Sequence, residues 1–103
     1  MESEVKVITK FINTLYKPIN IEIGTLRNYE TAEIVINVFF DEIDDKYITD
    51  KRNINIVRLK EYNLGLQIRK DIYNFFGIMT SGLSFEGYAP YKYHGIAIKV
   101  HLT

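Results

Sequence analysis

Residues 59–77 read LKEYNLGLQIRKDIYNFFG and are the longest periodic segment of the chain. Apolar residues recur here every three or four positions, the spacing that places side chains on one face of an α-helix. The stripe consists of Leu64, Ile68, Ile72, Phe75 and Met79. Gly77 stands where a left-handed residue can end a helix at little steric cost. We therefore expect a helix over Leu59–Gly77, mostly buried against a sheet.

A glycine, Gly65, interrupts this helix beside its apolar stripe. Glycine costs a helix interior roughly 0.8–1 kcal/mol relative to alanine. The cost is tolerable where a strand backbone packs closely, so we expect a strand next to Gly65.

The chain opens with a second amphipathic pattern. Val5, Ile8, Ile12 and Leu15 form its inner stripe, and polar residues that include two lysines face water. The exposed residues of this pattern are Lys6, Lys10 and Asn13. Proline disfavours helical backbone in the residue before it, so Pro18 ends this helix at or before Lys17.

Alternating apolar residues predict strands between and after the helices. The predicted segments are Ile19–Gly24, Thr31–Ile43, Asn53–Leu59, a modest strand with Leu83 and Phe85, and Tyr93–Leu102. Arg27–Glu30 is polar and predicts a turn. The expected fold is one α+β domain over residues 1–103, with two helices on one face of a mostly antiparallel sheet in the order α-β-β-β-α-β-β. Its core is expected to contain Ile36, Val38, Ile68, Ile72, Phe75, Ile96 and Ile98.

The composition excludes several classes of protein. The 103 residues include no cysteine, so disulfides and thiolate metal sites are ruled out. No apolar run approaches the ~18 residues of a membrane span, and the N-terminus lacks a signal-peptide pattern. The formal net charge is zero, which makes nucleic acid an unexpected partner because phosphate neutralisation supplies most of that affinity.

The neutral total conceals an uneven distribution of charge. Residues 41–50 carry five acidic side chains and one basic, whereas residues 51–103 carry eight basic and three acidic. We expect the charged loop Asp44–Asn53 to project from the sheet and to face basic groups of another copy, such as Arg58, Arg69 or Lys70. Scattered solvated charge is the plainer alternative. The candidate interface residues of this loop are Asp44, Asp45, Asp50, Lys51 and Arg52.

Tyrosines crowd the segment EGYAPYKYHG at residues 86–95. Tyr88, Tyr91 and Tyr93 stand beside Lys92 and His94. Such a group is typical of protein interfaces, can stack nucleobases, and also occurs in ordinary β-structure. We count the three tyrosines as candidate interface residues and leave these alternatives open.

No pattern of catalytic, cofactor-binding or metal-ligating residues stands out, so we expect a protein that is not an enzyme and carries no cofactor. His94 and His101 are seven apart in a predicted strand and therefore point to opposite faces. Ser81 and Ser84 lack the glycine context of a nucleophile elbow. The acidic run after residue 40 lacks the spacing and turn glycine of a calcium loop.

The order of elements resembles the head–tail connector and tail-completion proteins of tailed phages. The resemblance involves VKVITKFINTLYKP, IEIGTL, TAEIVINVFFDE, LKEYNLGLQIRKDIYNFFGI and YHGIAIKVHL, nearly the whole chain. It implies a structural protein of the virion neck that forms rings with its own copies and binds other structural proteins, located in the virion or the host cytoplasm. No individual functional residue carries over.

Two alternatives remain open. A small RNA-binding α+β module is one, although the sequence lacks the G-x-x-G loop of K-homology domains and the paired exposed aromatics of an RNA-recognition sheet. A small phage-encoded inhibitor that binds one host protein is the other. A ring-forming protein should self-associate, an RNA-binding module should carry bound nucleic acid, and an inhibitor should be a monomer.

Overall fold

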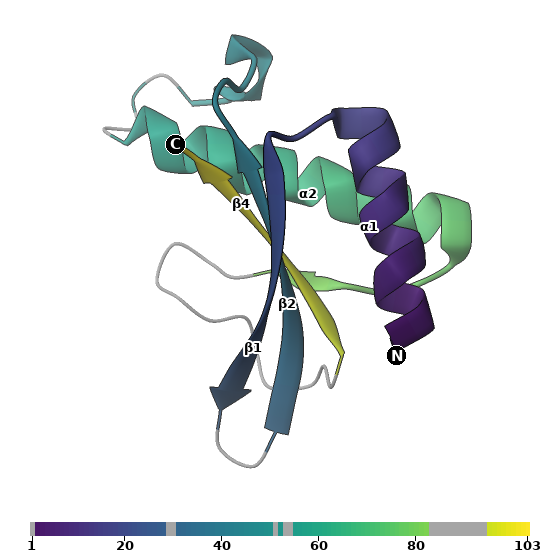
Figure 1. The fold of residues 1–103 in the computed structure, drawn as a ribbon. Helices are drawn as coiled ribbons and strands as arrows, with labels where there is room; N and C mark the ends of the chain where they lie inside the picture. Colours follow the sequence, from purple (N-terminus) through teal and green to yellow (C-terminus); the bar gives the residue numbers. More distant parts are fainter. Residues whose placement is uncertain (1, 29–30, 51, 53–54, 83–94) are drawn as a thin grey trace.

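A computed structural model describes residues 2–28, 31–50, 52, 55–82 and 95–103. Two long helices, a short 3-10 helix and four strands follow one another in these ranges (Figure 1). They are α1 (Glu2–Tyr16), β1 (Asn20–Asn28), β2 (Thr31–Phe40), η1 (Asp45–Tyr47), α2 (Ile56–Phe76), β3 (Ser81–Gly82) and β4 (Ile96–Leu102). The predicted α+β class is confirmed, and the element order matches in outline.

The sheet has the strand order β1-β2-β4-β3 and is mixed. β1 pairs with β2 antiparallel, but β4 runs parallel to both β2 and β3. The expectation of a mostly antiparallel sheet is therefore wrong. A parallel pair needs a long crossover, and the segment between β2 and β4, which includes α2, supplies it.

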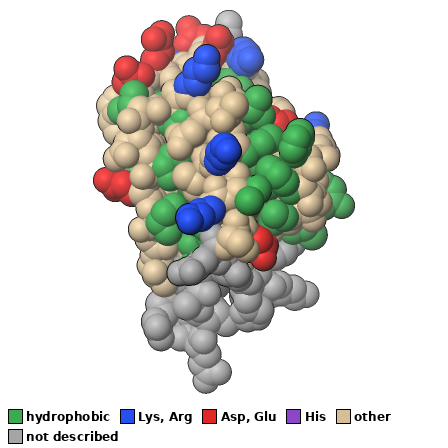
Figure 2. All heavy atoms as spheres, turned by 45° about the vertical axis from the view of Figure 1, so that its right-hand side comes forward, with side chains coloured by type: hydrophobic (Ala, Val, Ile, Leu, Met, Phe, Trp, Pro, Cys, Tyr) green, Lys and Arg blue, Asp and Glu red, His purple; other side chains and the backbone are tan. Residues whose placement is uncertain are grey.

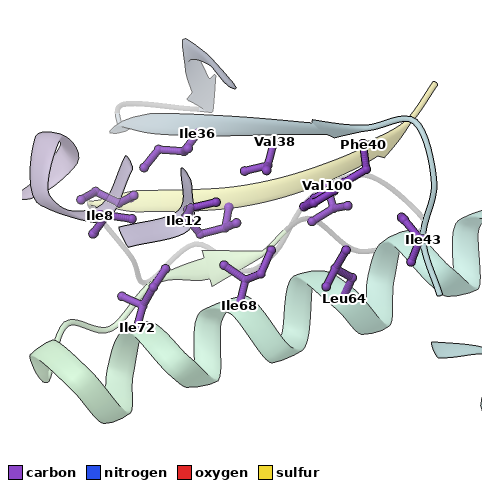
Figure 3. Close-up of a cluster of buried hydrophobic side chains, with 12 residues drawn as sticks. Ile8, Ile12, Ile36, Val38, Phe40, Ile43, Leu64, Ile68, Ile72 and Val100 are labelled. Carbon is purple, nitrogen blue, oxygen red and sulfur yellow. The ribbon is translucent and has the colours of Figure 1, made fainter. Parts of the chain in front are cut away.

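Both long helices pack on one face of the sheet. Figure 3 shows Ile8 and Ile12 of α1 and Leu64, Ile68 and Ile72 of α2 pointing toward the strands. The buried strand residues that they meet include Ile36, Val38, Phe40, Ile96, Ile98 and Val100. Six of the seven expected core residues are buried as predicted. Phe75 is the exception, because it is largely exposed.

The ends of α2 are set by local chemistry. Asn55 caps the helix, since its Oδ1 accepts a hydrogen bond of 3.0 Å from the backbone N–H of Arg58. The expected strand over Asn53–Leu59 is thus wrong from Asn55 onward, because the cap begins a helix there. At the other end Gly77 adopts φ 70°, and its N–H donates to Tyr73 O at 2.8 Å, as the sequence predicts.

The remaining boundaries differ by a few residues. α1 ends at Tyr16, and Lys17 before Pro18 takes φ 51°. β1 continues through Asn28, so the expected turn at Arg27–Glu30 is wrong for its first two residues. The expected strand around Leu83 and Phe85, and the N-terminal part of Tyr93–Leu102, lie outside the described residues.

Candidate protein-interaction surface

The last turn of α2 extends past the strands and lies beside α1 (Figure 1). Phe75 belongs to the apolar stripe of the sequence, yet 72% of its surface is exposed. Its ring packs against α1: the centroids of the Phe75 and Phe11 rings are 5.2 Å apart. Phe76 packs edge-on against both rings, at 4.9 Å from Phe75 and 5.1 Å from Phe11.

Apolar residues of α1 continue this cluster along the surface. Val7, Phe11 and Leu15 are four residues apart and so form one row on the helix. Val7 is 45% and Leu15 57% exposed, and Phe11 is half-buried. Phe11, Leu15 and Phe75 line a shallow depression of about 240 Å³ together with Asp71 and Asn74. We call the surface made by Val7, Phe11, Leu15 and Phe75 the apolar helix face.

Figure 2 shows apolar side chains gathered on this side of the molecule, beside a row of basic ones. Contiguous exposed apolar surface on a small protein marks a binding site more often than isolated exposed residues do. Aromatic rings surrounded by polar residues are also typical of the centre of protein interfaces. Such a face can bind protein through apolar contact.

Hydrogen bonds hold α1 and α2 in place beside this face. The Tyr16 hydroxyl donates to the Asp71 carboxylate, and Gln67 Nε2 donates to the other Asp71 oxygen at 2.9 Å. Burial, together with the Asp71 charge and hydrogen bond, raises the pKa of Tyr16 well above its usual range. The hydrogen bond from the Tyr16 hydroxyl to Asp71 joins the last turn of α1 to α2.

The predicted interface loop packs on its own chain and does not project freely. Asp44 caps η1 by accepting from Lys46 N at 2.8 Å. Asp45 forms a 2.7 Å ion pair with Lys60 of α2, and this ammonium lowers the pKa of Asp45. Asn63 Nδ2 of α2 donates to Tyr47 O at 2.6 Å. Asp44 and Asp45 thus have partners within the chain, because α2 begins beside the loop. Contact of this loop with another copy stays a prediction.

The other predicted site residues do not gather into one place among the described residues. Asp50 pairs locally with Arg52, whose Nε lies 3.2 Å from Asp50 Oδ1. Arg69, an expected basic partner for another copy, is half-buried and packs across Gly82. Lys51, Tyr88, Tyr91 and Tyr93 lie outside the described residues.

A second surface feature lies on the sheet face opposite the helices. Phe39 of β2 stacks on His101 of β4, with ring centroids 4.7 Å apart, and His101 Nε2 donates to Asn37 Oδ1 at 2.8 Å. Burial lowers the pKa of His101, Lys99 lowers it further, and Glu61 and Glu22 oppose the shift. The parallel register that pairs Phe39 with His101 is what brings these rings together.

The sequence pattern places two residues of the apolar helix face, Leu15 and Phe75, on the inner stripes of their helices, whereas the structure exposes both. Leu15 and Phe75 fit the apolar stripes of their helices, and each lies in a last turn, three residues before Pro18 and two before Gly77, respectively. Closeness to the helix end does not separate them from core positions, because Tyr16 and Phe76 lie nearer to Pro18 and Gly77 and still pack against the core. The second-face pair Phe39 and His101 depends on strand register, which the sequence does not give.

Within the described residues, no group of three or more histidine, aspartate or glutamate side chains is placed to hold a metal ion. In the same ranges, neither long helix combines the length and apolar character that crossing a membrane requires. Comparison with protein-family models, curated protein sequences and solved structures finds no match to this chain.

Proposed function

We propose that this protein is a non-enzymatic structural protein that assembles with its own copies and with neighbouring proteins through the apolar helix face. The observation that carries the proposal is the exposure of Phe75 and Leu15, which continue two core stripes onto the surface. Burying exposed apolar area stabilises a complex by roughly 25 cal/mol per Å² before the costs of association. Covering these side chains with a partner gives the association its driving force.

The specific setting we propose is the neck or tail-completion ring of a tailed phage. Its support is the resemblance in element order that the sequence shows from VKVITKFINTLYKP to YHGIAIKVHL. A ring component acts by binding, which fits a protein that exposes an apolar surface on its helices. Other structural proteins of the same particle are then its further partners.

An RNA-binding module is the second candidate, and the Phe39–His101 pair with exposed Lys99 favours it. Aromatic rings on an open sheet face can stack bases. The two rings already stack on each other, however, and Glu22 on the neighbouring strand opposes phosphate. A single-target inhibitor would use the apolar helix face as a monomer, so the state of the free protein distinguishes it from a ring component.

Sedimentation velocity over a range of protein concentrations tests the proposal. We expect the wild type to self-associate and Phe75→Ser to weaken association at least about tenfold, the loss typical of an interface hot spot. Tyr73→Ser is the matched control, because Tyr73 lies in the same helix and is also exposed but lies outside the apolar helix face. A wild type that stays monomeric at every concentration, or equal behaviour of the two variants, would contradict self-assembly through this face.

A further inference from the structure

The apolar helix face has a basic border. Lys6 and Lys10 are exposed on α1, four residues apart, and so lie in a row beside that of Val7 and Phe11. Lys17 is exposed just past the end of the helix. Figure 2 shows basic side chains in a row next to the apolar ones. Glu4 is an exposed acid of this helix, so the border carries more positive than negative charge.

The end of the sheet where β2 and β4 terminate has the opposite character. Asp41, Glu42, Asp44 and Asp45 are exposed there around a depression of about 540 Å³, which Leu102 also lines. Acidic side chains gather at this end of the molecule in Figure 2. Ile19 adds apolar surface here, since its side chain is 56% exposed. Its backbone N–H donates to Phe39 O at 2.8 Å, which places Ile19 beside the end of β2. We call this surface the acidic strand end.

We propose that the occupant of the apolar helix face is the acidic strand end of a second copy of the chain. Each surface combines apolar side chains with an excess of charge of one sign, and the two excesses are opposite. The minority charges are Glu4 and Asp71 beside the apolar helix face and Lys60, which pairs with Asp45, at the acidic strand end. Apolar contact supplies most of the affinity in such an arrangement, and the charges set orientation and encounter rate. This inference rests on the proposed function, since it names the partner surface for the same face.

The contact is head-to-tail because it joins two different surfaces of the same molecule. Every copy then keeps one free apolar helix face and one free acidic strand end, so association continues beyond a dimer into a ring or an open array. A symmetric contact of two apolar helix faces would instead use up this surface in both copies and would stop at a dimer.

Charge reversal on each surface tests the proposal. One variant carries Lys6→Glu and Lys10→Glu, and the other carries Asp41→Lys and Glu42→Lys. Asp44 and Asp45 are left unchanged, because the first caps η1 and the second pairs with Lys60. Lys99→Glu is the control, since it also reverses an exposed lysine but lies on the sheet face opposite the helices.

Sedimentation velocity at low salt should show self-association weakened at least about tenfold in each double variant alone, since like charges then face each other. An equimolar mixture of the two should recover it, because the reversed surfaces match across the two proteins. Lys99→Glu should behave as the wild type does. Association of the Asp41→Lys, Glu42→Lys variant at wild-type strength, or no recovery in the mixture, would overturn the inference. Loss of association in Phe75→Ser alone would then still support the proposed function.

Discussion

The two ends of the α2 stripe have the same sequence period but different surroundings. Ile68 and Ile72 are fully buried in the core cluster, whereas Phe75, three residues further, is mostly exposed. The difference arises because the Phe75 ring lies against Phe11 of α1 on the surface and does not belong to the core cluster that contains Ile68 and Ile72. An apolar stripe therefore defines a helix face, and the neighbouring elements decide which part of that face becomes core and which part becomes surface.

The largest expected effect is the difference in the free energy of unfolding between substitutions in the buried and the exposed part of the α2 stripe. Ile72→Ala should lower the free energy of unfolding by about 2–5 kcal/mol, because it leaves a cavity in a packed core. Phe75→Ala should lower it by only about 1 kcal/mol, the loss of its contacts with Phe11 and Phe76. Urea denaturation of dilute protein measures both, and equal losses would show that Phe75 is a core residue after all.

Two glycines compare the middle of α2 with its end, and their substitution should have smaller effects on stability. A Cβ on Gly65 would lie 3.3 Å from the flexible Arg69 guanidinium and 3.7 Å from Val100 Cγ2, so alanine fits after a slight shift of Arg69. Gly65→Ala should raise the free energy of unfolding by about 0.5–1 kcal/mol through helix propensity. Gly77→Ala should lower it by about 1 kcal/mol, because Gly77 takes φ 70°. Thermal unfolding of both variants is the measurement, and destabilisation by Gly65→Ala would mean that β4 cannot give way.

The smallest expected effect is the contribution of His101, on the sheet face opposite the helices, to the pH dependence of stability. Because the pKa of His101 is lowered by burial and by Lys99, the unfolded chain takes up a proton more readily there than the folded protein. His101 therefore stabilises the fold above its ordinary pKa of about 6.5, and that contribution is lost as the pH falls below it toward the lower folded value. His101→Asn should reduce the drop in melting temperature between pH 8 and pH 5. If the drop in melting temperature were the same in His101→Asn and the wild type, His101 would not be a cause of the loss of stability at low pH.

Much of the architecture follows from local patterns. The two helices, their inner faces and the left-handed residue at Gly77 depend on neighbouring residues, and the sequence predicts them. The parallel pairing of β2 with β4 depends on a crossover over many residues, and no local pattern reports it. A local pattern also misleads at Asn55. The sequence NINIV alternates as a strand does, yet Asn55 caps a helix.

The candidate site was less predictable than the fold. The acidic loop was recognisable by its charge, but the ion pair of Asp45 with Lys60 depends on how η1 packs against α2. The apolar helix face was hidden by the rule that periodic apolar residues are buried. Two of its residues, Leu15 and Phe75, have the same helical spacing as core residues, and only the packing of the helices shows that they are exposed.

The central claim is that the apolar helix face is covered when copies associate, and thiol labelling tests it directly. The chain has no cysteine, so Leu15→Cys introduces a single thiol on this face and Leu66→Cys a single thiol on an exposed part of α2 outside it. The labelling rate of the Leu15→Cys protein should fall by about tenfold or more between dilute and concentrated protein, whereas that of the Leu66→Cys protein should stay constant. Equal rates for the Leu15→Cys thiol at all concentrations would contradict the claim.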